Sequence, residues 1–157
     1  MGRKLLAKPV AASQVRMTEI VNPEDTNPLG TIFGGRVMEL IDKAAAVASM
    51  RHCRAITVTA SVERIDFISP IRLGMIVMVL ASVNRTFRTS MEVGVKVLAE
   101  DPRTGAVTHT CTAYATMVAL DGNGAAQPVP PLRLRTAEER RRARDAGRRR
   151  RVRRRGR

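Results

Sequence analysis

The sequence has little of what redox, metal or serine-hydrolase chemistry requires. It contains two cysteines, Cys53 and Cys111, and two histidines, His52 and His109. Two cysteines without a characteristic spacing form neither a disulfide framework nor a metal site, and they are typical of reduced, buried thiols. Two separated histidines argue against zinc, and a serine triad lacks support because no Gly-x-Ser-x-Gly motif is present. We therefore expect no metal and no cofactor.

Long apolar segments are also missing. No run approaches the roughly 20 residues that a membrane-spanning helix needs. The basic start at Arg3 and Lys4 is not followed by the apolar region of a signal peptide. Leu6 stands where a myristoylation signal requires Ser or Thr. These absences predict a soluble, cytoplasmic protein.

Acidic residues are scarce at one end of the chain only. Residues 133–157 contain 14 arginines against three acids, a net charge of +11. The whole chain carries +14, which leaves +3 for residues 1–132. This tail has no aromatic residue, so we expect it to be disordered and to bind polyanions without specificity. A capping box at Thr136 leaves a helix open as an alternative, although repulsion among the arginines would weaken it without an anionic partner.

One helix is predicted in the first half of the chain. From Gly35 to about His52 the apolar residues recur at spacings of three and four, which places them on one helical face. They are Val37, Leu40, Ile41, Ala44, Ala45 and Ala48. The alanines allow such a helix to lie close to a sheet that wraps around it. His52 at its end is expected to cap backbone carbonyls.

The rest of the domain has the period of β-strands. A short strand is expected over residues 14–21, and four strands rich in Val, Ile, Thr and Met follow the helix. These four are 57–68, 75–87, 91–100 and 107–120. In the third, Glu92 and Lys96 should face out, and His109 in the fourth should be packed or interfacial. Because the connections are short, we predict an α+β fold of the hotdog type, an antiparallel sheet wrapped around a central helix.

The chain of 157 residues is long enough for one domain with a substantial core. We divide it into a flexible N-terminus (residues 1–12), a hotdog domain (residues 13–132) and the arginine-rich tail (residues 133–157). The chemistry is then expected in the middle segment.

Residues 22–42 hold the most informative motif of the chain. A loop with Asn27 leads into Gly34 and Gly35 and then into the predicted helix, with Asp42 at the rim of its buried face. An amide, free N–H groups at a helix N-terminus and a carboxylate can together bind a carbonyl oxygen and activate water. Each residue also has a simpler interpretation: a local turn cap, a flexible turn and a surface acid near a helix start.

The chain resembles the hotdog-fold acyl-CoA thioesterases over about residues 14–132. The first block of the resemblance runs from Asn27 through Gly30-Thr-Ile-Phe-Gly34-Gly35 to Ile41-Asp42. The later blocks are Val58-Thr-Ala-Ser-Val62, Ile65-Asp-Phe67 and Arg88-Thr-Ser-Met-Glu-Val93. Their order and spacing make the resemblance more specific than any single motif.

The resemblance implies that the protein hydrolyses acyl-CoA to a free fatty acid and CoA. In this family the active site lies at a dimer interface, where a loop Asn of one subunit meets a helix Asp of the other. The matching positions are Asn27 and Asp42. Asp42 would act as general base on water or as nucleophile, and the N–H groups of Gly34 or Gly35 would polarise the carbonyl.

The resemblance also implies a homodimer, assembled as a trimer of dimers, with CoA phosphates near Arg88, Thr89 and Ser90. Alternatively, Arg85 and Arg88 belong to a solvated hairpin. Two other functions stay open. One is a non-catalytic acyl-CoA-binding hotdog regulator, and the other is a nucleic-acid-associated protein that binds phosphates through its tail. The tail has no counterpart in the family pattern. Attraction to an anionic membrane surface, contact with CoA phosphates and no function at all therefore stay open for it as well.

Overall fold

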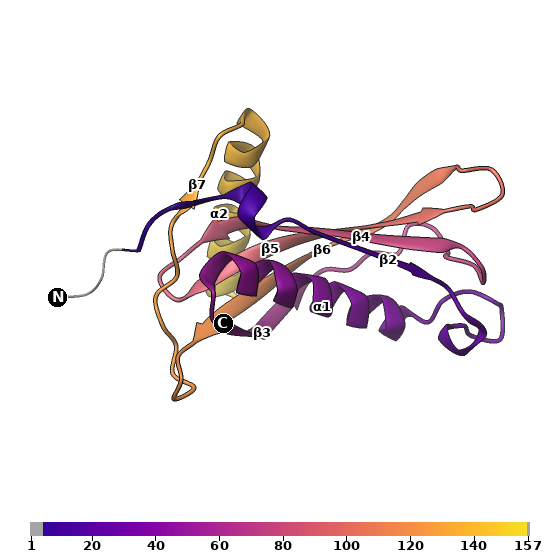
Figure 1. The fold of residues 1–157 in the computed structure, drawn as a ribbon, viewed down its shortest axis with the longest axis horizontal. Coiled ribbons are helices and arrows are strands. Elements are labelled where there is room, and N and C mark those ends of the chain that lie inside the picture. Colours follow the sequence, from indigo (N-terminus) through magenta and orange to yellow (C-terminus); the bar gives the residue numbers. More distant parts are fainter. Residues whose placement is uncertain (1–4, 157) are drawn as a thin grey trace.

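The computed structural model describes residues 5–156 (Figure 1). The main elements are β2 (Val15–Ile20), α1 (Gly34–Cys53), β3 (Ile56–Glu63), β4 (Ile76–Thr86), β5 (Ser90–Glu100), β6 (Val107–Leu120) and α2 (Ala137–Arg155). Short elements flank them: β1 (Lys8–Pro9), η1 (Val10–Ser13), η2 (Pro23–Asp25) and β7 (Leu132–Arg133). No helix of this described part is long and apolar enough to cross a membrane.

The five longer strands form one antiparallel sheet in the order β2-β4-β5-β6-β3. Strands β4, β5 and β6 pair in sequence order, whereas β3 crosses to the far edge beside β6. Helix α1 lies along one face of this sheet (Figure 1). The predicted α+β hotdog fold is therefore confirmed. Strand β3 is shorter than predicted and ends at Glu63, because Arg64 adopts a positive φ of 35° that interrupts the extended backbone.

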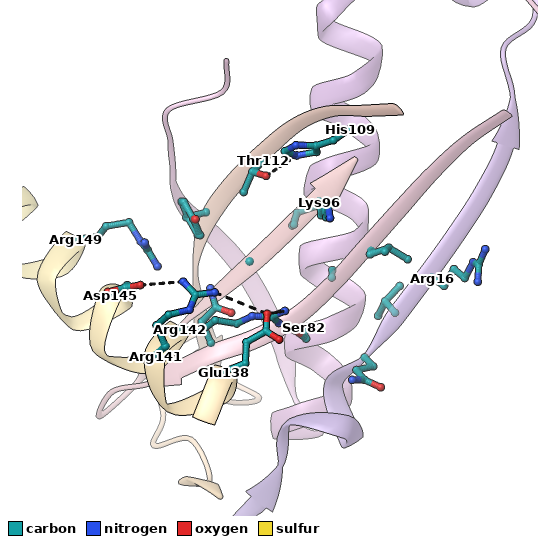
Figure 2. A pocket seen from close by; sticks show the side chains of 18 residues that line it. Arg16, Ser82, Lys96, His109, Thr112, Glu138, Arg141, Arg142, Asp145 and Arg149 are labelled. Carbon is teal, nitrogen blue, oxygen red and sulfur yellow. Dashed lines mark hydrogen bonds and ion pairs between the residues drawn. The ribbon is translucent and has the colours of Figure 1, made fainter. Parts of the chain in front are cut away.

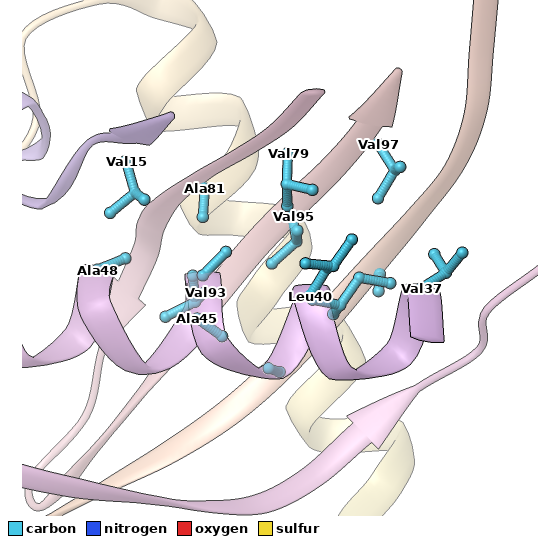
Figure 3. Packing of buried hydrophobic residues seen from close by; sticks show 14 of the residues in the cluster. Val15, Val37, Leu40, Ala45, Ala48, Val79, Ala81, Val93, Val95 and Val97 are labelled. Atoms are coloured by element: carbon cyan, nitrogen blue, oxygen red, sulfur yellow. The ribbon is translucent and has the colours of Figure 1, made fainter. Parts of the chain in front are cut away.

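The core lies between α1 and the sheet (Figure 3). All six predicted apolar residues of α1 are buried. They meet alternate residues of the central strands, among them Val79, Ala81, Val93, Val95 and Val97. Half of the helix face consists of alanine, whose small side chain lets the helix approach the strands closely. This packing fixes the rotation of α1 and so places Asp42 beside the core rather than in it.

Strand β3 forms an edge of the sheet and exposes apolar side chains. Within the described residues it pairs with β6 alone. Ile56, Val58 and Val62 are 68, 44 and 38% exposed. An open strand edge with apolar side chains is a surface that proteins normally cover. This edge is therefore well suited to contact another subunit.

The prediction of a flexible N-terminus over residues 1–12 is wrong for its second half; residues 1–4 lie outside the described part. β1 pairs in parallel with β7. Val10 is buried, and the hydroxyl of Ser13 accepts a hydrogen bond from the backbone N–H of Val83 at 2.9 Å. These contacts join segments far apart in the sequence, so no local pattern indicates them.

The prediction that His52 caps helix carbonyls is also wrong. Its side chain is fully buried, and Nε2 donates to the backbone oxygen of Pro130 at 2.9 Å. Instead, Lys8 donates to the carbonyl of His52 at 2.6 Å. Nδ1 of His52 has no partner among the described residues, which fits a neutral ring with its proton on Nε2. Burial lowers the pKa of His52 below its usual value, and the hydrogen bond to Pro130 opposes this only in part.

We expect His52 to make the protein less stable in mild acid. Below about pH 6.5 the unfolded chain takes up a proton at this position, whereas the folded state resists because its pKa is lowered. The unfolded state then binds more protons, so the free energy of unfolding falls as the pH drops below this value. Urea unfolding at about pH 7.5 and about pH 5.5 should show this loss in the wild type and a smaller loss in His52→Gln. An equal loss in both proteins would contradict the expectation.

The prediction of a disordered tail is wrong for residues 137–155, which form α2. The alternative of a helix that starts after Thr136 is the correct one. Thr136 accepts from the backbone N–H of Glu139 at 3.1 Å, and the Glu139 carboxylate accepts in return from Thr136 N at 3.2 Å. α2 packs through small buried residues on the face of the sheet opposite α1 (Figure 1). These are Ala143, Ala146 and Gly147.

Two ion pairs attach α2 to the sheet. Arg149 donates twice to the carboxylate of Glu92, at 3.0 and 2.7 Å, and its guanidinium lies 3.6 Å from the ring centre of Tyr114. Arg153 pairs with Glu63. Glu92 faces away from the core as the sequence predicts, but α2 covers it and leaves it 3% exposed. The anionic partner that an arginine-rich helix requires is thus supplied by the sheet itself.

Candidate functional site

The loop that carries Asn27 is fixed against the start of α1. The carboxylate of Asp25 accepts from the backbone N–H of Asn22 and from Nε of Arg36, each at 3.0 Å. Arg36 also pairs with Glu19 of β2 at 2.6 Å. One arginine on the first turn of α1 therefore ties both the loop and the neighbouring strand to the helix.

Asn27 is half-buried, and its side chain bonds within its own loop. Its Oδ1 accepts from the backbone N–H groups of Leu29 at 3.0 Å and Thr31 at 3.2 Å. Its Nδ2 donates to the hydroxyl of Thr31 at 2.8 Å. Gly30 completes the turn with a φ of 75°, a conformation that favours glycine. In one protomer Asn27 is thus a local turn cap, and these bonds fix the orientation of its amide.

Helix α1 begins with backbone N–H groups that no residue caps. The N-cap residue Phe33 makes no side-chain hydrogen bond, and within residues 5–156 the N–H groups of Gly34 and Gly35 have no acceptor. A Cβ added at Gly35 would meet nothing within 4 Å, and one at Gly34 would meet only the ring of Phe67 at 3.5 Å. Neither glycine has a positive φ, so the backbone does not require glycine at either position. Both glycines are exposed, so a ligand can approach their two uncapped N–H groups.

Asp42 is exposed at the rim of α1, as the helical wheel predicts. The hydroxyl of Thr59 in β3 donates to its Oδ1 at 2.5 Å, and the same hydroxyl lies 3.5 Å from the sulfur of Met117. The pairing of β3 with β6 shifts register just after Thr59. Oδ2 of Asp42 has no hydrogen-bond partner in the described part of the chain. A carboxylate held at one oxygen and open at the other can accept a proton from a bound water.

Asn27 and Asp42 do not meet within one protomer. The helix rises about 12 Å between Gly34 and Asp42, and no described hydrogen bond joins the two predicted catalytic side chains. The protomer therefore holds two half-sites. One is Asn27 with the uncapped helix start, and the other is Asp42 with Thr59.

The turn between β4 and β5 lies against α2. There, a small hollow of about 200 Å³, which we call the arginine pocket, combines sheet hydroxyls with guanidinium groups of α2. Its lining residues are Thr89, Ser90, Thr116, Val118, Arg150, Arg153 and Arg154. Of the predicted CoA-binding residues, Thr89 and Ser90 are brought together here, whereas Arg88 is exposed and outside the pocket. Arg85 belongs to the attachment of α2, since it donates to the carbonyl of Ala143 at 3.0 Å.

A larger groove of about 650 Å³ lies between α2 and the outer face of the sheet (Figure 2). Neither predicted catalytic residue lines it. Its acids on α2 are already paired, Asp145 with Arg141 at 3.3 Å and Glu138 with Arg142 at 2.7 Å. The groove therefore holds no open carboxylate comparable to Asp42.

Other nucleophiles and metal ligands find no support. Within residues 5–156 no three His, Cys, Asp or Glu side chains gather as a possible metal site. Burial raises the pKa of the thiols of Cys53 and Cys111, which disfavours the reactive thiolate. His109 is exposed on its strand rather than packed in the core, and its Nε2 lies 2.9 Å from the hydroxyl of Thr112.

Known proteins resemble this chain along most of its length. The sequence profile of the Thioesterase superfamily matches residues 29–106. YkhA of Bacillus subtilis, described as an uncharacterized acyl-CoA thioester hydrolase, is 43% identical over 127 residues, which are 81% of this chain and 74% of that protein. An apo-hexameric acyl-CoA thioesterase, 40% identical, superposes with a TM-score of 0.93 over 96% of this chain and 97% of that one.

An acyl-CoA hydrolase of Staphylococcus aureus, solved in complex with butyryl coenzyme A, coenzyme A and coenzyme A disulfide, is 34% identical. It superposes with a TM-score of 0.87 over 94% of this chain and 92% of that one. Three further structures of that enzyme replace an Asn, an Asp and a Thr by Ala. The replaced residues lie 15 and 17 positions apart, the same intervals that separate Asn27, Asp42 and Thr59 here. Thr59 was not predicted, because in the sequence it is one hydroxyl residue among several in a β-strand.

Proposed function

This chain belongs to the Thioesterase superfamily and is an acyl-CoA thioester hydrolase, and we propose that Asp42 is its catalytic carboxylate. The observation that carries the proposal is the hydrogen bond from Thr59 to a carboxylate whose other oxygen is open. The matching intervals of the residues replaced in the Staphylococcus aureus enzyme support the same group of three, completed by Asn27. Thr59 is a positioning residue, since it orients Asp42 and needs no contact with the substrate.

Asp42 provides the nucleophile for hydrolysis of the thioester, either by activating water or by attacking the carbonyl itself. Hydrolysis requires an oxygen nucleophile to attack the carbonyl carbon and the bond from that carbon to the CoA sulfur to break. Oδ2 of Asp42 either removes a proton from the attacking water or attacks the carbonyl itself, after which water releases the acyl group. The CoA thiolate takes up the proton, and the products are a free acid and CoA.

The backbone N–H groups of Gly34 and Gly35 are the proposed oxyanion hole. They are uncapped, they belong to exposed residues, and they lie at the positive end of the helix dipole. Fixed donors of this kind lower a barrier by about 3 kcal/mol, because they meet charge that develops only in the transition state. The amide of Asn27, held by its loop, would orient the carbonyl or the attacking water.

A second subunit is required because the half-sites lie apart. The edge strand β3 carries both the exposed Ile56 and Val58 and the neighbouring Thr59. Two copies of β3 placed side by side would cover these apolar side chains and bring Asp42 with Thr59 to the interface. The half-site with Asn27 would then come from the partner. The hexameric state of the thioesterase that is 40% identical supports a trimer of such dimers.

Release of CoA tests the function directly. Purified protein is incubated with short-, medium- and long-chain acyl-CoA, and the free thiol is measured with a colorimetric reagent. We expect hydrolysis of at least one chain length. Binding of acyl-CoA without release from any chain would overturn the catalytic proposal and indicate a non-catalytic acyl-CoA-binding protein.

Mixing two inactive variants tests the site between subunits. Asn27→Ala and Asp42→Ala each damage every site of their own dimers. In a mixed dimer one site receives wild-type Asn27 and wild-type Asp42, and the other receives neither. Random exchange after mild unfolding and refolding should therefore restore about a quarter of wild-type activity. Each variant refolded alone is the control, and no recovery in mixed oligomers of normal size would contradict the two-subunit site.

A further inference from the structure

Helix α2 presents a row of arginines to solvent along one flank. They follow one another at intervals of three or four residues, so they lie on the same side of the helix. All of them are exposed, and we call them the arginine stripe: Arg140, Arg144, Arg148, Arg151 and Arg155. The arginines that attach α2 to the sheet, Arg149 and Arg153, lie outside it. The stripe is about 22 Å long, because its ends are 15 helical residues apart.

The fold does not neutralise the charge of the arginine stripe. Arg148 lies 3.8 Å from Asp145, but that acid is already paired with Arg141 at 3.3 Å. Within residues 5–156 the other four members make no ion pair. Neighbouring like charges along a helix repel one another and reduce its stability. A partner with many negative charges would remove this repulsion.

Two possible partners match the stripe poorly. A second copy of this chain is unsuitable, because two stripes would repel each other and residues 1–132 also carry a net charge of +3. A helix that binds a membrane surface normally inserts an apolar face. The small apolar residues of α2 are buried against the sheet, and its one large apolar side chain, Val152, does not form such a face.

We propose that the arginine stripe binds the phosphate backbone of a nucleic-acid duplex without sequence preference. A duplex carries one negative charge for about every 1.7 Å of its axis, so a stripe of about 22 Å faces about 13 phosphates. Each guanidinium can donate two parallel hydrogen bonds to one phosphate. The tail has no aromatic residue on which single-stranded bases could stack, which favours a duplex.

The position of α2 limits these contacts to the backbone and separates them from catalysis. A recognition helix projects into the major groove, whereas α2 lies flat against the sheet (Figure 1). Its face of the sheet is opposite the one that α1 covers with Asp42 (Figure 1). The proposed binding therefore does not depend on the thioesterase function, and it would hold the enzyme on nucleic acid with its catalytic helix on the other side.

Fluorescence anisotropy with labelled DNA tests the proposal. The wild type is titrated into two duplexes of about 12 base pairs and unrelated sequence, at salt concentrations from about 50 to 200 mM. Both duplexes should give the same Kd. This Kd should rise about 500-fold over the range, because five phosphate contacts give a slope of about −4.5 for log K against log salt. A strong preference for one sequence, or no binding at about 50 mM salt, would overturn the proposal.

Two triple variants with the same charge assign the binding to the stripe. The first combines Arg144→Gln, Arg148→Gln and Arg151→Gln, and glutamine keeps a high helix propensity at these exposed positions. Its Kd should rise at least about tenfold at about 50 mM salt, and its slope should be less steep by about 2.7. The control replaces three exposed arginines outside α2 by Gln, namely Arg51, Arg54 and Arg103. Its Kd should stay within about twofold of the wild type, and an equal loss in both variants would overturn the proposal.

Two further measurements separate this surface from the active site and from a membrane. The stripe variant should release CoA at the wild-type rate and unfold at the wild-type temperature, which shows that loss of duplex binding is not loss of the fold. Sedimentation with vesicles of phosphatidylglycerol and phosphatidylcholine tests the membrane. A wild type that binds these vesicles but not the duplexes would overturn the nucleic-acid assignment in favour of an anionic membrane surface.

Discussion

Replacement of Asp42 by alanine is expected to lower kcat about 10³-fold and to leave the fold intact. The substitution removes the group that activates the nucleophile, while the donors at Gly34 and Gly35 keep a residual rate. Asp42 is exposed, and its hydrogen bond comes from Thr59 alone among the described residues, so its loss leaves no buried charge unpaired. The measurement is CoA release at saturating acyl-CoA, with circular dichroism and thermal unfolding as checks on the fold.

The matched control is Glu39→Ala. Glu39 is an exposed acid on the same helix, and it pairs with Arg36 at 2.9 Å and Lys43 at 2.5 Å on the solvated side. Its removal should leave kcat within about twofold of the wild type. Thr59→Val, which removes the hydroxyl but keeps the size, should lower kcat about tenfold, because Asp42 stays present but loses its orientation. Wild-type kcat in Asp42→Ala would refute the carboxylate assignment.

Local patterns predict the central part of the fold because one helix and one sheet must bury each other. The spacing of apolar residues from Val37 to Ala48 determines which face of α1 is covered. The alternation along β5 determines which of its side chains meet that face, with Glu92 on the other side. Short turns between β4, β5 and β6 require antiparallel pairing. These features depend on neighbours in the sequence, so the sequence alone is sufficient for them.

The course of the tail could not be predicted, because its stability comes from distant partners. Fourteen arginines in 25 residues repel one another and are typical of a disordered segment. Their neutralising acids, Glu92 and Glu63, lie 57 and 90 residues away from their partners on α2. The strand pattern predicts that the side chain of Glu92 points away from the core, but it does not predict that α2 covers this side chain. The same limit applies to β1 and His52, whose partners lie near residue 130.

The sequence predicts the site residues that lie close together in one segment. It does not predict those that the fold brings in from a distant segment. Asn27, Gly34, Gly35 and Asp42 follow one another within 16 residues, so their chemistry is apparent in the sequence. Thr59 becomes a site residue only because the fold places β3 next to α1, where its hydroxyl reaches Asp42. The turn at Thr89 and Ser90 indicated phosphate binding. The arginines that face this turn come from α2, a segment that the sequence predicts to be disordered.

Removal of the Arg149 side chain is expected to lower the free energy of unfolding by about 3 kcal/mol. Glu92 is almost completely buried, and without Arg149 the amide of Asn84, at 3.1 Å, is its one remaining donor among residues 5–156. Burial alone would disfavour the charge on Arg149, but the hydrogen bonds and charge of Glu92 outweigh it and raise the pKa of Arg149 above its usual value. Arg149→Ala leaves the acid without this compensation. Urea unfolding measures the loss, and faster cleavage of α2 by trypsin should accompany it.

Two further variants distinguish loss of this pair from loss of any arginine of α2. Arg148→Ala removes an exposed neighbour that lies 3.8 Å from Asp145, and it should change the free energy of unfolding by less than about 0.5 kcal/mol. Glu92→Met combined with Arg149→Met should recover much of the loss, because no buried charge is then left unpaired. Unchanged stability and trypsin resistance in Arg149→Ala would show that α2 does not depend on the Glu92 pair. Destabilisation in the single variant with recovery in the double would establish that an uncompensated acid, not a missing contact, is what loosens the helix.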